Sequence, residues 1–279
     1  NDAWQATLLR LMEPWLGDSR VFERSNRSAH DGGPLARTAA AHLIGRRGDD
    51  GPMLEKVLGD PLKSVRAAAA WAAVERLPSD HPAIREISEI ASHQSDQPAG
   101  AMSMARLAVI RGDASEAEKW FKRAAEWDAA SPVPRRDLAV FLSGQGRTAD
   151  SIAWLEDAGR VDPDNAEIPY LIALAYAETG ETTKARASLE QAVQRDPSFS
   201  RAWYNLGLLQ NSMGDTDQAI ASLRQAADLD PSSPAAPYAA ATIHLRLGQI
   251  DQAVQAAQET LRRDPAHPQA RQLLQQLRR

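Results

Sequence analysis

Apolar and polar positions follow a helical rhythm along most of the chain, and from residue 98 this rhythm repeats every 34 residues. Within each repeat, apolar or small side chains recur three and four places apart in two runs, which predicts two amphipathic helices. A small residue stands at the eighth place of every unit (Ala105, Ala139, Ala173, Gly207 and Ala241) and at the twentieth (Ala117, Ser151, Ala185, Ala219 and Ala253). These small residues predict that the two helices of a unit approach each other closely.

A glycine separates the two helices of every unit, namely Gly112, Gly146, Gly180, Gly214 and Gly248. Glycine at this joint allows the left-handed backbone that ends a helix. An Asp-Pro step closes the second helix of the last four units, at residues 162–163, 196–197, 230–231 and 264–265, because the residue before proline is pushed out of the helical region. A fixed period of this length predicts an all-α solenoid of stacked helical hairpins.

The strongest unit reads Trp-Tyr-Asn-Leu-Gly at residues 203–207, followed by Ala219, Leu223, Ala226 and Pro231. The unit before it is almost as complete, with Ile172, Ala173, Tyr176, Ala185, Leu189, Ala192 and Pro197. On these residues, 98–267 resembles five units of the tetratricopeptide repeat (TPR) family, which implies a right-handed superhelix. Departures are Ala129 in place of proline in the first unit, and Ala257 and Thr260 in the last. Residues 268–279, with Leu273, Leu274 and Leu277 against Arg and Gln, predict a capping helix.

Residues 34–95 follow another rhythm, in which 36–45 is echoed 29 residues later by 65–74, with an Asp-Pro step before the second copy. This segment resembles HEAT-type helical repeats, and a further helix is expected at Pro82–His93. Residues 1–33 are expected to form an N-terminal helix and a loop. The helix carries Trp4, Leu8, Leu9 and Trp15, and the loop is assigned to Gly17–Gly33 because that stretch is rich in Arg, Ser and Gly.

The candidate binding surface is the face of the first helices that carries the fifth and ninth places of each unit. The fifth place holds Met102, Arg136, Tyr170, Tyr204 and Tyr238, and the ninth holds Arg106, Val140, Leu174, Leu208 and Thr242. In the TPR family these positions line a concave groove, so the resemblance implies a site for a protein or peptide partner. Tyrosine offers a large contact area with one polar tip. The alternative interpretation is that the tyrosines simply pack on the following repeat.

Asn205 matches an asparagine with which some TPR proteins bind a C-terminal carboxylate. Val140, Leu174 and Leu208 are apolar where that clamp would need polar groups. The ligand favoured by this stripe is therefore an apolar or aromatic-bearing segment.

Composition removes several classes of function. A net charge of −5 provides no basic field for nucleic acid, and no apolar run approaches the length of a membrane span. The absence of cysteine excludes disulfides, thiolate metal sites and cysteine nucleophiles. The six histidines form no short-spaced pair with a carboxylate, so we expect no metal or other cofactor in this chain and no enzyme.

The first functional hypothesis is accordingly a non-enzymatic interaction and assembly scaffold. A HEAT-like pair followed by TPR units is also similar to the C-terminal part of bacterial multihaem cytochrome proteins. That resemblance implies a docking module for a cytochrome subunit or domain whose haem motifs lie outside this chain, in the bacterial periplasm or at the cell exterior. A regulatory arm of an enzyme is a third hypothesis.

Self-association is a further expectation. The N-terminal stretch with Trp4, Leu8, Leu11 and Trp15 leaves an end without an obvious polar cap, and solenoid ends can stack. The chain begins at Asn1 rather than Met, which favours a processed chain or part of a longer one.

Overall fold

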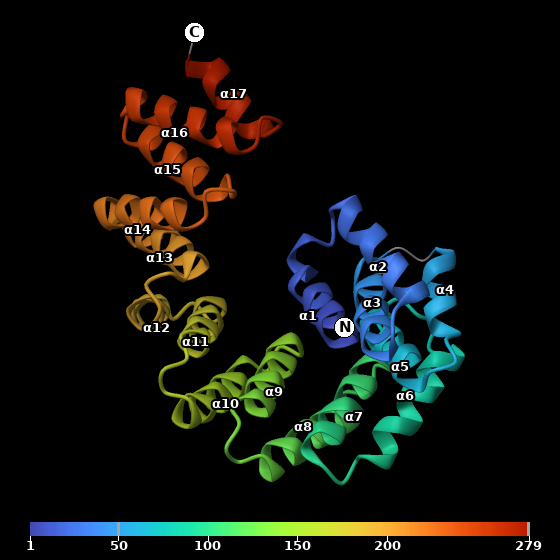
Figure 1. Ribbon diagram of the computed structural model, residues 1–279. Helices are drawn as coiled ribbons and strands as arrows, with labels where there is room; N and C mark the ends of the chain where they lie inside the picture. Colours follow the sequence, from blue (N-terminus) through green and yellow to red (C-terminus); the bar gives the residue numbers. More distant parts are fainter. Residues whose placement is uncertain (49–50, 278–279) are drawn as a thin grey trace. The chain divides into compact units, whose positions relative to one another are not determined.

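The computed structural model describes residues 1–48 and 51–277, and within these ranges it consists of helices and their connections, without a strand. The chain forms two compact units, Asn1–Trp127 (unit 1) and Asp128–Arg279 (unit 2). Figure 1 shows the helices of both units, coloured along the sequence. The predicted all-α solenoid class is confirmed.

Unit 1 is built around one small-residue helix. Its elements are α1 (Asp2–Leu11), η1 (Glu13–Trp15), α2 (Ser19–Asp31), α3 (Pro34–Arg46), α4 (Pro52–Leu58), α5 (Lys63–Ala73), α6 (Pro82–His93), α7 (Pro98–Ile110) and α8 (Ala114–Trp127). Helices α1, α2 and α5 all pack against α3. These contacts bury most of α3. The buried residues, which are mostly small, are Ala36, Ala39, Ala40, Ala41, Leu43, Ile44 and Gly45.

The loop predicted for Gly17–Gly33 is wrong, because α2 occupies most of that stretch. Asp18 begins the helix by accepting a hydrogen bond from the Arg20 backbone N–H at 2.8 Å. The buried face consists of Val21, Ser25, Ser28 and Ala29, which are mostly small rather than strongly apolar. The buried Ser25 hydroxyl donates to the Val21 carbonyl at 2.9 Å, so burial leaves it with a partner. A polar composition therefore concealed an amphipathic helix.

The helices expected between residues 34 and 95 are present, and α6 spans Pro82–His93 as predicted. The Asp-Pro step before α5 places a nearly buried Asp60 carboxylate in an ion pair with Arg37. Asp60 also accepts from the Leu62 backbone N–H at 2.8 Å, which fixes the turn that starts α5. The HEAT-type identity of this segment stays a prediction.

The division between the two units falls after the first 34-residue repeat rather than before it. Leu107 of α7 belongs to the hydrophobic core of unit 1, and Met104 and Ile110 pack against that core. The first hairpin, α7–α8, is thereby part of unit 1.

Unit 2 contains the other four hairpins and a final helix. Its helices are α9 (Val133–Gly144), α10 (Thr148–Val161), α11 (Glu167–Glu178), α12 (Thr182–Arg195), α13 (Ser200–Met213), α14 (Thr216–Leu229), α15 (Ala235–Arg246), α16 (Ile250–Arg263) and α17 (Pro268–Leu277). The second helix of each hairpin also packs on the first helix of the next. Helix α17 buries Leu273 and Leu274 against Ala241 and Ala257, which confirms the capping helix. The last two residues of its predicted range, 278–279, lie outside the described residues.

Both joints of the repeat have the backbone that the sequence predicts. The five periodic glycines have φ between +71° and +90°, and within the described residues only glycines have positive φ. At the Asp-Pro joint, which follows the second helix of a hairpin, Asp196 and Asp264 each accept a hydrogen bond from the backbone N–H two residues further on, both at 2.9 Å. At the equivalent Asp230, the Ser232 hydroxyl donates to the carboxylate and holds its pKa below the usual range.

Close helix contact predicts opposite effects for two glycine-to-alanine substitutions. A Cβ at Gly207 would lie 2.8 Å from Leu223 Cγ and 3.0 Å from the Ala219 carbonyl oxygen, whereas at Gly144 nothing lies within 4 Å. We expect Gly207→Ala to lower the free energy of unfolding by about 1–3 kcal/mol. Gly144→Ala should raise it by about 0.5–1 kcal/mol, because alanine favours the helix.

Urea denaturation followed by circular dichroism measures both changes. Equal effects of the two substitutions would contradict the close approach of α13 and α14.

Candidate functional site

Three aliphatic side chains at the ninth place of successive repeats are exposed in unit 2. Val140 of α9, Leu174 of α11 and Leu208 of α13 are 53%, 40% and 38% exposed. We call these three residues the apolar ridge. The ninth place of the last repeat ends the series with Thr242, which is exposed and donates its hydroxyl to the Ala239 carbonyl at 2.7 Å.

The first two ridge residues share one hollow. Val140 and Leu174 line a cavity of about 160 Å³ whose other apolar walls come from Leu155, Leu171 and Ala175. Glu178 lies at the polar side of the cavity, where it accepts from the Ser143 hydroxyl at 3.4 Å and from the Thr148 hydroxyl at 3.2 Å. The structure therefore brings neighbouring ridge positions together around an apolar recess with a fixed carboxylate.

The fifth-place tyrosines are half-buried, and two of them contact aromatic rings that come just before a later helix of the stack. The Tyr170 ring lies 4.9 Å from the Phe199 ring, and its hydroxyl accepts from Asn205 Nδ2 at 3.1 Å. The Tyr238 ring lies 4.8 Å from the His267 imidazole, just before α17. These contacts match the alternative interpretation, in which the tyrosines pack on the next repeat.

Tyr204 and Arg136 also make contacts between hairpins. Tyr204 packs against the core shared by α14 and α15. Arg136 forms ion pairs with Asp137 at 2.9 Å and with Glu167 of α11 at 3.0 Å. Burial alone would lower the pKa of Arg136, but the two carboxylates outweigh it and the pKa is raised. Its charge is therefore neutralised within the array.

Two predicted residues lie in unit 1. Met102 is half-buried on α7. Arg106 is exposed on the same helix, with its guanidinium 5.3 Å from the centre of the Trp71 ring. They belong to a different compact unit from the ridge.

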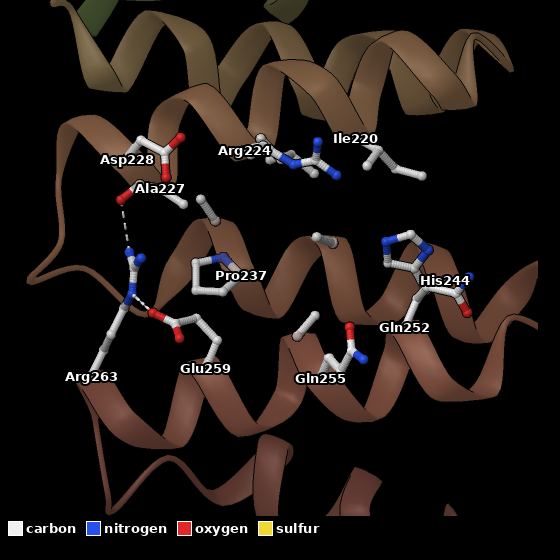
Figure 2. A pocket seen from close by; sticks show the side chains of 14 residues that line it. Ile220, Arg224, Ala227, Asp228, Pro237, His244, Gln252, Gln255, Glu259 and Arg263 are labelled. Atoms are coloured by element: carbon white, nitrogen blue, oxygen red, sulfur yellow. Dashed lines mark hydrogen bonds and ion pairs between the residues drawn. The ribbon is translucent and has the colours of Figure 1, made fainter.

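A second hollow, which the sequence analysis missed, lies between α14, α15 and α16 (Figure 2). Its volume is about 460 Å³, and Ala227, Ala236, Pro237, Ala240 and Ala256 contribute small apolar walls. At one end Arg263 pairs with Glu259 at 2.8 Å and donates to the Ala227 carbonyl at 3.0 Å. His244 lies toward the other end, with Nδ1 2.6 Å from Gln249 Oε1.

Two residues that line this cleft are smaller than their counterparts in the preceding repeat. Pro237 and Ala240 stand at the fourth and seventh places, where the preceding repeat has Trp203 and Leu206. The signal was present in the sequence as a change from large to small residues at two aligned places.

The described residues contain no cluster of three or more His, Asp or Glu that could hold a metal ion. In the same part of the chain, no helix has both the length and the apolar character needed to span a bilayer.

Comparison with known families identifies the repeats. Models described as tetratricopeptide repeat match residues 108–175, 170–234 and 211–277, which together cover 108–277 without a gap. No curated protein sequence matches the chain.

Several solved structures share the fold. The crystal structure of MamA aligns with a TM-score of 0.53 at 23% identity, over 58% of this chain and 95% of that chain. MamA 41-end from Desulfovibrio magneticus RS-1 aligns with a TM-score of 0.52 at 18% identity, over 65% of this chain and 97% of that chain. YrrB, described as a TPR protein with an unusual peptide-binding site, aligns with a TM-score of 0.53 at 15% identity, over 68% of this chain and 97% of that chain. At these identities the likeness shows the helical-repeat fold.

The cleft predicts opposite outcomes for two adjacent alanines. Ala240 is half-buried and lines the cleft, whereas Ala241 is fully buried. Ala240→Leu should fill space that Leu206 fills one repeat earlier, and should raise the free energy of unfolding by about 0.5–2 kcal/mol. Ala241→Leu should lower it by about 1–3 kcal/mol through overpacking.

Thermal and urea unfolding of the two variants provide the measurement. Destabilisation of similar size at both positions would show that no usable space exists above Ala240.

Proposed function

Because residues 108–277 belong to the tetratricopeptide repeat family, we propose that this chain is a non-enzymatic scaffold that binds a protein or peptide partner along the apolar ridge. The observation that carries the proposal is the exposure of Val140, Leu174 and Leu208 at one place of three successive repeats. Contiguous exposed apolar surface on a soluble protein commonly marks an interaction site.

The fifth-place residues stabilise the helices that carry the ridge. Tyr170, Tyr204 and Arg136 are engaged in contacts between hairpins, so they fix the spacing of α9, α11 and α13. A ridge on rigid helices loses little freedom when a partner docks, which favours binding.

The recess beside Val140 and Leu174 supports an apolar anchor on the partner. An apolar cavity of about 150 Å³ in a protein can hold a benzene ring, and the recess is about 160 Å³. One aliphatic or aromatic side chain of the partner fits this volume. Asn205 is already bonded to the Tyr170 hydroxyl, so the partner is expected to bind through an internal apolar segment rather than a terminal carboxylate.

Two finer hypotheses stay predictions. One is docking to a cytochrome subunit or domain in the bacterial periplasm or at the cell exterior, and the other is a regulatory arm of an enzyme. No contact or cavity among the described residues favours either over a general scaffold.

The ridge can be tested with charge substitutions that spare the tyrosines. Random peptides displayed on phage would be selected on the purified chain, and the enriched peptides measured by fluorescence polarisation. We expect apolar and aromatic anchors in these peptides. The double substitution Leu174→Arg/Leu208→Arg should weaken their binding at least about tenfold, because it places two charges on the docking surface.

A matched control is available in the same unit. Leu247 and Ile250 are 44% and 43% exposed at the turn between α15 and α16, outside the ridge. Leu247→Arg/Ile250→Arg makes the same change of charge at similar exposure, and should leave peptide affinity within about twofold. Unchanged affinity in the ridge variant, or equal loss in the control, would place the binding surface elsewhere.

A further inference from the structure

Helix α1 and the 3-10 helix η1 that follows it expose their largest apolar side chains. Trp4, Leu8, Leu11 and Trp15 are 67%, 49%, 64% and 61% exposed, whereas Leu9 of the same helix is fully buried. We call these four exposed residues the N-terminal stripe. Two exposed indoles and two exposed leucines within twelve residues form an apolar surface that the described residues leave uncovered.

The stripe reads the same in both directions. The order of residues is Trp-Leu-Leu-Trp, and the intervals are four, three and four places. An interface between two identical chains related by a two-fold axis must be self-complementary, so that when residue i contacts residue j, j also contacts i. An antiparallel second copy meets this condition, since Trp4 then faces Trp15 of the other copy and Leu8 faces Leu11.

We propose that the N-terminal stripe is an antiparallel, two-fold interface with a second copy of this chain. Intervals of three and four residues keep apolar side chains on one side of a helix and form the seam of helix pairs. Trp15 lies beyond the end of α1, in the short 3-10 helix η1, and Met12, which joins the two elements, keeps helical backbone angles (φ −84°, ψ −6°).

The acidic groups of this segment do not oppose the pairing. The Asp2 carboxylate accepts from the backbone N–H groups of Leu35 and Ala36 at 2.9 and 2.8 Å, at the start of α3. The Glu13 carboxylate lies 3.5 Å from both His42 Nε2 and Arg46 Nε. Both carboxylates are thus engaged with their own chain, so the stripe can be desolvated without stranding either charge.

At the C-terminal end, the residues that the structure describes offer no matching surface. The outer side of α17 is polar, with exposed Gln269, Arg271, Gln272, Gln275 and Gln276. Head-to-tail stacking would therefore place two tryptophans on glutamines and an arginine, whereas pairing of two N-terminal stripes places apolar groups on apolar groups. The stripe accordingly favours a closed dimer over an open chain of copies.

The area involved sets the expected strength. Two tryptophans and two leucines from each copy would bury on the order of 1,000 Å² in total, the lower limit for a specific interface. The expected dimer is therefore a weak one, with a dissociation constant on the order of micromolar.

A charge exchange between two variants tests both the pairing and its direction. Sedimentation velocity of the wild-type chain over a concentration series should show a shift from monomer to dimer. Trp4→Arg and Trp15→Glu should each weaken dimerisation at least about tenfold, since each homodimer would place two charges against indoles. Both side chains are more than 60% exposed, so the substitutions leave the core intact.

An equimolar mixture of the two variants should recover a heterodimer. In the antiparallel pair, the arginine of one variant faces the glutamate of the other, and the remaining Trp4 and Trp15 still face each other. Leu174→Arg/Leu208→Arg serves as the control, since the ridge lies in the other unit; it should dimerise like the wild type.

Three results would overturn the proposal. They are a wild-type chain that stays monomeric at all concentrations, a dimer that both stripe variants retain, and a mixture that does not recover. The last result, with the first two excluded, would reject the antiparallel register.

Discussion

The close approach of the two helices within each hairpin is the constraint on which the rest of the structure depends. The residues at the eighth and twentieth places are buried in every repeat, with Ala139, Ala185 and Ala219 at 0% exposure. Small residues let the backbones approach, but they bury little apolar area themselves. Each hairpin must therefore obtain stability from its neighbours, as is general for repeat proteins.

That requirement explains where the larger polar and aromatic side chains are used. Arg263 donates to the carbonyls of Ala227, Asp230 and Ser233 at 3.0–3.1 Å and so holds the connection between α14 and α15. A side-chain hydrogen bond from Asn205 Nδ2 to the Tyr170 hydroxyl joins α13 to α11. Side chains committed to such joints are not free for a ligand, whereas Val140, Leu174 and Leu208 at the ninth place stay exposed.

The sequence allowed prediction of those features that depend on local backbone chemistry. Helices, glycine joints and Asp-Pro ends follow from residue type and spacing alone, and α6 was predicted to the residue. Helix α2 was missed because its buried face uses serines, whose burial becomes acceptable only through hydrogen bonds such as Ser25 to Val21. The Asn205–Tyr170 bond depends on how successive hairpins are placed, which spacing within one hairpin does not specify.

The exposed apolar surfaces lie where the repeating arrangement leaves a side chain without a neighbour. Along the stack, the second helix of each hairpin is covered by the next hairpin, but the ninth place of the first helices is not. At its end, unit 2 is closed by α17, which turns leucines inward and glutamines outward. The N-terminal segment does the reverse, since α1 packs Ala6 and Leu9 on the core, whereas Trp4 of α1 and Trp15 of η1 are exposed. A helix that merely closed an end would gain nothing from exposing its largest apolar groups, so the arrangement of α1 is better explained by contact with another surface than by capping.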